Sequence, residues 1–305
     1  MVSAARLAEV IDRNRLAPVE VATLVYVGFT TAAALLFGGP DRPWMLTAHA
    51  LVVAVALLAP AARAAGPVGR FLGDWYPILL VTALYSEIGV LNLEHGQQHD
   101  FAIQHLELWV FGSQVSYRWI RAMPNPALSS LLHSCYLSYF AILVAAPLGQ
   151  WLSGRRDGAR LTIFAIMATL YFCYVVSLFF PVAGPRYAFP LADNAATQVW
   201  PARAAQWILD TGDSWGAAFP SSHVAASIVA TLCALRFWRP LGLALAPLTT
   251  GLIFAVVYGQ FHYGVDALVG IVVAIVIWTS LNEYAWRDQA PALRPAADLR
   301  SSPLL

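Results

Sequence analysis

Long apolar stretches recur along the chain and are separated by short segments rich in Arg, Asp, Gly and Pro. A helix needs about 20 mostly apolar residues to cross the hydrocarbon core of a bilayer. The stretches that approach this length, the sixth only marginally, are Pro18–Phe37, Trp44–Ala62, Trp75–Leu93, Leu128–Leu152, Leu161–Pro181, Ser221–Phe237, Leu241–Tyr258 and Gly264–Tyr284. We therefore predict an all-α, polytopic membrane helical bundle of about eight transmembrane helices, forming one integral membrane domain over residues 1–305.

Composition agrees with this pattern, because 59% of the 305 residues are hydrophobic, only 11% are charged and the mean hydropathy is +0.62. These values are far from those of a soluble globular domain. The first stretch is long and lacks a small-residue cleavage site before a polar start, so we expect it to stay in the chain. A net charge of +1 without a basic run argues against a nucleic-acid partner.

The basic residues, all of them Arg, define an orientation, because cytoplasmic loops of membrane proteins collect positive charge. With the N-terminus inside, thirteen arginines fall on the cytoplasmic side and five outside. We therefore expect a cytoplasmic segment 1–17, a flexible cytoplasmic tail 287–305, and outer segments 94–127 and 182–220. The Arg- and Ala-rich composition indicates a bacterial plasma membrane, with the active site on the non-cytoplasmic face.

The cysteines, Cys135, Cys173 and Cys233, all lie inside predicted spans without metal-ligand spacing. We interpret them as small apolar packing residues.

Polar residues gather in the outer segments. Segment 182–220 leads into Pro220-Ser221-Ser222-His223 at the start of the sixth span. A helix N-terminus offers unpaired N–H groups and partial positive charge, and serine hydroxyls can add donors. This point is a plausible cradle for a phosphate, and Arg186 with the neighbouring Tyr187 lies earlier in the same segment.

A second polar group follows the seventh span, where His262 and Asp266 are four residues apart. If this turn is helical, both side chains lie on one face, and the carboxylate fixes the tautomer of the imidazole and raises its basicity. His262 then becomes a nucleophile or base, and His223 can serve as the acid. Taken singly, each histidine is more often an ordinary hydrogen-bonded residue.

Segment 94–127 contains a dense polar run that has two interpretations. Its members are Glu94, His95, His99, Asp100, His105 and Glu107. A metal cluster is one alternative, but the spacing fits no common zinc pattern. We favour an outer loop with an interfacial helix, Leu106–Phe111, that acts as a headgroup-binding lid over the site.

Three motifs resemble the signatures of the type 2 phosphatidic acid phosphatase superfamily, in order and in spacing. They are GPR at Gly184–Arg186, FPSSH at Phe219–His223 and HYGVD at His262–Asp266. The resemblance is strong over about the last 125 residues and implies a six-helix phosphatase-like core. The middle motif has Ser222 where the superfamily commonly has Gly.

Two cations of the superfamily pattern are absent. The chain has no Lys, which normally precedes the Arg of the first motif, and Val256 stands where an Arg normally precedes the His of the third. The branch that resembles inositol phosphorylceramide synthase and sphingomyelin synthase also lacks these cations. A diester has about one negative charge and a monoester up to two, so fewer cations suit a diester.

The resemblance implies a membrane lipid phosphotransferase that needs no metal or cofactor and moves a phosphorylated headgroup from a membrane phospholipid or lipid-linked phosphate to an acceptor alcohol. His262 would attack phosphorus, Asp266 would orient it, and His223 would protonate the departing alcohol. Arg186, Ser221, Ser222 and Tyr187 would bind the substrate. The alternatives are a lipid phosphate phosphatase, with water as the acceptor, and a non-catalytic phospholipid transporter or flippase.

Overall fold

The computed structural model describes residues 16–37, 39–95 and 98–284, and every regular element in these ranges is a helix. Eight of the helices correspond to the predicted spans: α2 (Pro18–Phe37), α3 (Arg42–Ala64), α4 (Pro67–His95), α7 (Pro126–Leu152), α8 (Arg156–Phe179), α11 (Ser222–Phe237), α12 (Arg239–Tyr258) and α13 (Gly264–Tyr284). The all-α prediction is confirmed for this part of the chain. Apart from Leu16 and Ala17, the predicted terminal segments 1–17 and 287–305 lie outside the described residues.

In the described part, six helices are long and apolar enough to cross a membrane, which is characteristic of an integral membrane protein. The two predicted spans that do not meet this standard are α4 and α11, so the count of eight is not confirmed. Helix α4 contains Asp74, which is paired with Arg63 and Arg160, and Glu87, which is paired with His49. Helix α11 has only 16 residues.

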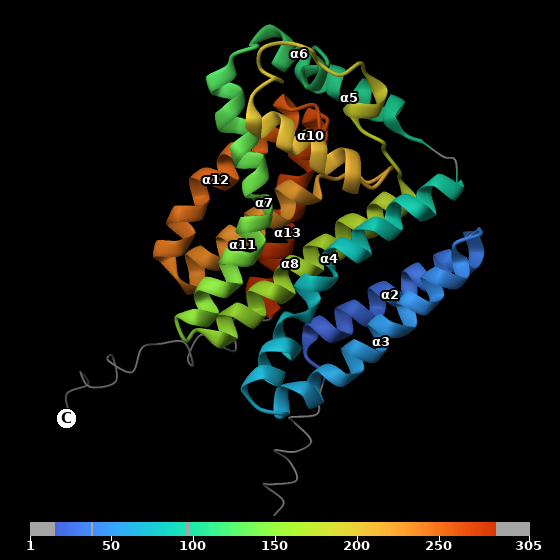
Figure 1. Ribbon diagram of the computed structural model, residues 1–305, viewed down its shortest axis with the longest axis vertical. Helices are drawn as coiled ribbons and strands as arrows, with labels where there is room; N and C mark the ends of the chain where they lie inside the picture. The colour runs from blue at the N-terminus through green and yellow to red at the C-terminus, as the bar shows by residue number, and fades with distance from the viewer. Residues whose placement is uncertain (1–15, 38, 96–97, 285–305) are drawn as a thin grey trace, which may run out of the picture.

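The short helix α11 forms the centre of the bundle and packs against α7, α8, α12 and α13 (Figure 1). Ser221 caps its N-terminus by accepting a hydrogen bond from the N–H of Val224. Because most of α11 is buried by protein, its length is set by its neighbours rather than by the thickness of the bilayer. Helices α2 and α3 form an antiparallel pair beside α4 and α8 (Figure 1).

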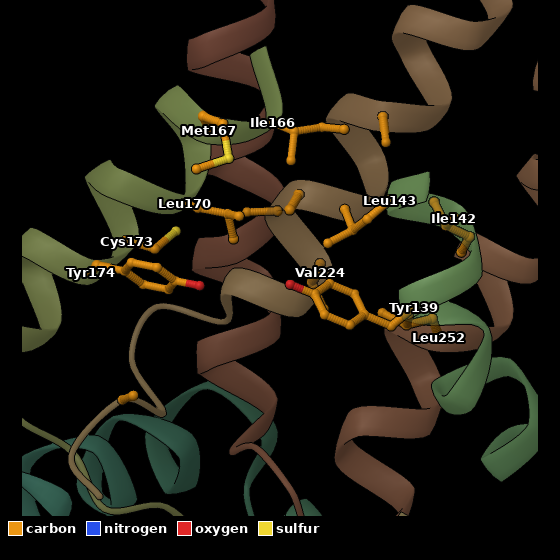
Figure 2. Packing of buried hydrophobic residues seen from close by; sticks show 14 of the residues in the cluster. Tyr139, Ile142, Leu143, Ile166, Met167, Leu170, Cys173, Tyr174, Val224 and Leu252 are labelled. Atoms are coloured by element: carbon orange, nitrogen blue, oxygen red, sulfur yellow. The ribbon is translucent and has the colours of Figure 1, made fainter. Parts of the chain in front are cut away.

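The core around α11 is built from aliphatic and aromatic side chains of α7, α8 and α12. Figure 2 shows Ile142 and Leu143 of α7 opposite Ile166 and Leu170 of α8, with the hydroxyl ends of two tyrosines pointing toward each other. These tyrosines are Tyr139 and Tyr174, and both are buried.

The three cysteines are buried and free. Cys135 lies against Gly251, where an added Cβ would be only 2.4 Å from its sulfur, so it fills a close contact between α7 and α12. This placement agrees with the packing role predicted for the cysteines.

Four short helices lie at one end of the bundle, at the top of Figure 1: α5 (Asp100–Phe111), α6 (Val115–Ala122), α9 (Pro185–Ala188) and α10 (Trp200–Gly212). Segment 94–127 therefore contains two helices, one more than predicted, and α4 extends to His95. Helix α10, in segment 182–220, was not predicted. It exposes Trp200 and Trp207, side chains that favour a membrane interface.

Candidate active site

The three motif segments meet at this end of the bundle and are joined through their backbones. The N–H of Val182 donates to Gly216 at 3.1 Å, and the N–H of Ala218 donates to Val182 at 3.0 Å, which ties the first motif to the second. The N–H of Ser221 donates to the carbonyl of Asp266 at 3.1 Å, which ties the second to the third. Residues far apart in sequence thus share one site.

The two motif histidines face each other across this site. Nε2 of His262 lies 3.5 Å from Nδ1 of His223, and Nδ1 of His262 lies 2.8 Å from the carbonyl oxygen of Ala218. A carbonyl oxygen only accepts hydrogen bonds, so Nδ1 of His262 carries the proton. Its Nε2 lone pair is therefore free and directed toward His223, the arrangement that an imidazole nucleophile requires.

Asp266 lies beside His262, although not on a shared helical face. Helix α13 begins at Gly264, so His262 precedes it, whereas Asp266 is in its first turn. The carboxylate oxygen Oδ2 is 3.6 Å from Nδ1 of His262 and accepts a hydrogen bond from the N–H of Tyr263 at 2.8 Å. The Ala218 carbonyl, which sequence reasoning missed, is thus the direct hydrogen-bond partner of the imidazole, and Asp266 supplies a buried negative charge next to it.

Arg186 is the only cationic side chain among the described residues that line the cavity at the histidines. It forms an ion pair with Asp210 of α10, while its Nη1 is buried without a hydrogen-bond partner. The guanidinium lowers the pKa of the exposed Asp210 carboxyl below its ordinary value through this hydrogen bond. Nη1 is an unused donor that an anionic oxygen at the site can fill.

The other predicted substrate-binding residues lie around this cavity rather than in its lining. Ser221 is fully buried and its hydroxyl caps α11, and Ser222 is buried against a neighbouring cavity. Tyr187 is half exposed and donates its hydroxyl to Asp213 at 3.2 Å. Of the seven predicted residues, the described structure brings His223, His262 and Arg186 to one cavity. Asp266 lies outside the lining of this cavity, next to His262.

Three cavities lie next to one another here. The catalytic cavity, lined by both histidines and Arg186, has a volume of only about 20 Å³. A mainly apolar cavity of about 260 Å³ shares His223, Tyr85 and Tyr136 with it. A more polar groove of about 410 Å³ lies under α10 and shares Phe261 with the catalytic cavity. The site therefore has an apolar side at His223 and a polar side at Phe261.

Aromatic rings surround His223. The ring centroids of Tyr139 and Tyr136 lie 4.4 and 5.5 Å from that of the imidazole. Tyr85 of α4 donates its hydroxyl to Asp213 at 2.9 Å, and Asp213 also lines the catalytic cavity. Aromatic residues at the helical spacing of Tyr136 and Tyr139 usually serve packing, and only their position beside a motif histidine distinguishes these two.

The polar run of segment 94–127 does not form a metal site among the described residues, where no group of three or more His, Cys, Asp or Glu side chains is arranged to hold an ion. The side chains of Glu94 and His95 are outside that description. His99 stacks on Phe180, while Asp100 and Glu107 are buried.

Comparison with known proteins assigns the family. A family model described as the PAP2 superfamily matches residues 102–280, more than half of the chain. The chain belongs to this superfamily, whose members are generally phosphatases or phosphotransferases that act on lipid phosphates. No curated protein and no solved structure matches the chain.

The matched region begins in α5 and contains five of the predicted spans, and α4, which packs against α8, completes a six-helix bundle around the site. Val256, where the superfamily pattern has a cation, is buried in the core, and its carbonyl accepts hydrogen bonds from the N–H groups of Phe261 and His262. This position shapes the loop that holds His262 and brings no charge to the site.

Proposed function

We propose that the protein is a membrane lipid phosphotransferase that moves a phosphorylated headgroup from a lipid donor to an acceptor alcohol through a phospho-histidine intermediate. The observation that carries the proposal is the free Nε2 of His262, held by the Ala218 carbonyl on the opposite nitrogen and directed toward His223. This geometry is that of a nucleophile paired with an acid.

The reaction has two displacements. In the first, Nε2 of His262 forms a bond to phosphorus while the bond to the oxygen of the donor lipid alcohol breaks, and His223 gives its proton to that oxygen. In the second, the acceptor hydroxyl attacks phosphorus, His223 takes its proton and the bond from phosphorus to nitrogen breaks. Arg186 stabilises the charge on the equatorial oxygens, and Asp266 stabilises the cationic phospho-imidazole.

The distribution of cavities supports transfer rather than hydrolysis. The apolar cavity at His223 suits a lipid alcohol, which must leave or enter beside the residue that handles its proton. The groove under α10 is lined by polar side chains that can bind a headgroup, among them Gln198, Gln206 and Gln260. Arg186 lines the cavity at the histidines and Arg203 lines the groove, so a single cation faces the position of phosphorus, which suits the single negative charge of a phosphodiester.

The test is product analysis by mass spectrometry. The detergent-purified protein is incubated with a total membrane lipid extract, with and without added inositol-type or glycerol-type alcohols. The expected products are the free lipid alcohol of the donor and an acceptor alcohol that carries the phosphorylated headgroup, and His262→Ala and His223→Ala should each abolish this transfer while the protein remains folded. Release of inorganic phosphate would assign a lipid phosphate phosphatase instead, and normal turnover in either variant would remove the histidines from the mechanism.

A further inference from the structure

Asp100, the first residue of α5, connects the first and third motif segments. Its Oδ2 accepts the N–H of Ala183 at 2.8 Å, and its Oδ1 accepts the N–H of Gly184 at 2.8 Å and the hydroxyl of Tyr263 at 2.9 Å. Gly184 begins the motif that contains Arg186, and Tyr263 follows His262. One buried carboxylate therefore links the segments of the phosphate-binding and the nucleophilic residue.

Glu107 makes a second connection from the same helix. Its Oε1 accepts the N–H of Gly264 at 2.7 Å and that of Ser116 at 3.3 Å, and its Oε2 accepts the Ser116 hydroxyl at 2.9 Å. Burial raises the pKa of the Glu107 carboxyl above its ordinary value. Because α13 begins at Gly264, this contact fixes the start of the helix that contains Asp266.

Apolar packing between the two carboxylates completes the attachment. Ile103 lies on the same face of α5 as Asp100 and Glu107, at the spacing of one helix stripe, and is buried. It packs in a cluster with Val182, Ala218 and Val265, one residue from each motif segment. Ala218 is also the residue whose carbonyl holds His262, so α5 contacts all three parts of the site.

We propose that Asp100 and Glu107 are positioning residues, which hold Arg186 and His262 in the mutual geometry that phosphoryl transfer requires; the proposal rests on the proposed function. Neither residue lines the catalytic cavity, so each acts through the backbone it binds. This role differs from the headgroup-binding lid predicted from the sequence, because the two carboxylates accept hydrogen bonds from the motif segments and from Ser116.

The hydrogen-bond partners of Asp100 and Glu107 differ, so replacing each carboxylate by its amide should have different effects on kcat. Both oxygens of Asp100 face N–H donors, so the amide of Asp100→Asn must point its NH₂ at a backbone N–H. In Glu107→Gln the NH₂ faces the Ser116 hydroxyl, which can reverse and accept, so every bond survives. A misplacement of about 1 Å can lower the rate on the order of a hundredfold. We expect a kcat loss of that order in Asp100→Asn and in Glu107→Ala, which removes every bond of the carboxylate, and rescue to within about threefold of wild type in Glu107→Gln, which keeps them.

A second pair of variants separates positioning from general stability. Tyr263→Phe removes the hydroxyl that donates to Asp100 and accepts from Gln104, and it should lower kcat by about three- to tenfold. The double variant with Asp100→Asn should lose less than the product of the two single losses, since Asp100→Asn already loosens the segments that the Tyr263 hydroxyl helps to hold. Additive losses, or a kcat in Tyr263→Phe equal to wild type, would overturn the proposal even where Asp100→Asn does not fold.

Orthovanadate, a phosphate analogue, distinguishes failure of this inference from failure of the proposed function. Wild-type protein should gain thermal stability with vanadate and transfer phosphorylated headgroups in the lipid extract. Folded Asp100→Asn should have a lower melting temperature than wild type without vanadate, because its NH₂ faces a buried N–H, and should lose most of the gain with vanadate. Absence of both responses in wild type would overturn the proposed function. A normal vanadate response and normal kcat in folded Asp100→Asn would overturn the inference alone.

Discussion

Arg186 and Asp210 form an ion pair that connects the first motif to the amphipathic helix α10. Asp210 thus already binds the guanidinium that we expect to bind phosphate. The catalytic cavity beside this ion pair has room for little more than one water molecule. Nη2 of Arg186 is held by Asp210 while Nη1 has no partner, so an anionic substrate that binds more than one nitrogen of the guanidinium competes with Asp210. We therefore expect substrate binding to depend on Asp210 and on the placement of α10.

Asp210→Asn should lower the KM for the lipid donor by about two- to fivefold, because an exposed ion pair is worth at most about 1 kcal/mol. The measurement is initial rates at varied lipid concentration in mixed micelles. Asp157→Asn, which removes an exposed carboxylate paired only loosely with Arg160 at the opposite end of α8, is the control and should leave KM unchanged. An unchanged or higher KM in Asp210→Asn would show that the ion pair does not compete with substrate.

The same competition predicts a pH dependence of binding. The depressed pKa of Asp210 keeps its carboxylate ionised and the ion pair intact through the neutral range, and the pair is lost only as pH falls through that pKa. Wild-type KM should therefore approach that of Asp210→Asn at acid pH and exceed it at pH 7. Parallel pH profiles of KM for the two proteins would contradict this assignment.

Asp266→Asn should be slow but active, unlike His262→Ala. The Ala218 carbonyl already fixes the tautomer of His262, so the variant loses only the charge that stabilises the cationic phospho-imidazole. An opposite charge within about 4–6 Å favours the charged form by about one to three pKa units, so kcat should fall on the order of ten- to a thousandfold. A total loss of turnover in a folded variant would show that the carboxylate, and not the carbonyl, orients the imidazole.

Much of the site was readable from the sequence because its motifs specify residue types at fixed spacing. The histidines, Arg186 and the starts of α11 and α13 follow from local pattern, as do the apolar stretches of the eight long helices. The partners of these residues do not follow from local pattern, because they are distant in sequence. Asp100 is 86 residues from Arg186 and 162 residues from His262. Its role depends on which backbone groups the fold leaves unpaired.

The differences between the predicted and the observed helices have a related reason. Helix α10 was missed because an amphipathic helix of 13 residues has no spanning signal. The apolar signal of α4 is reduced by buried carboxylates such as Asp74, which tertiary ion pairs satisfy. In each case a contact between distant segments, absent from the local pattern, stabilises the element.

The apolar cavity can be tested at its exposed edge on α4. Thr82 of α4 is exposed and lines the cavity, while Ser86, one turn further along the same helix, is exposed and does not. Thr82→Trp should lower kcat/KM for long-chain lipids by about tenfold through lost access, and Ser86→Trp should leave it unchanged. Equal activity of both variants on long-chain lipids would show that the lipid reaches His223 by another route.

Gly216 tests whether the link between the first and second motifs is required for stability. Its φ of +85° disfavours any residue with a Cβ, and an added Cβ would lie 2.4 Å from the side-chain nitrogen of Asn92. Gly216→Ala should lower the free energy of unfolding by about 1–2 kcal/mol from the backbone alone, more with the clash. Gly28→Ala, at an open position in α2, should be neutral or stabilising. Asn92→Ala alone should also lower stability, because its Nδ2 donates to the carbonyls of Ser177 and Trp215. Thermal unfolding in detergent should therefore show a smaller loss from Gly216→Ala in the Asn92→Ala background than in wild type; no loss in that background would mean that the positive φ imposes no strain.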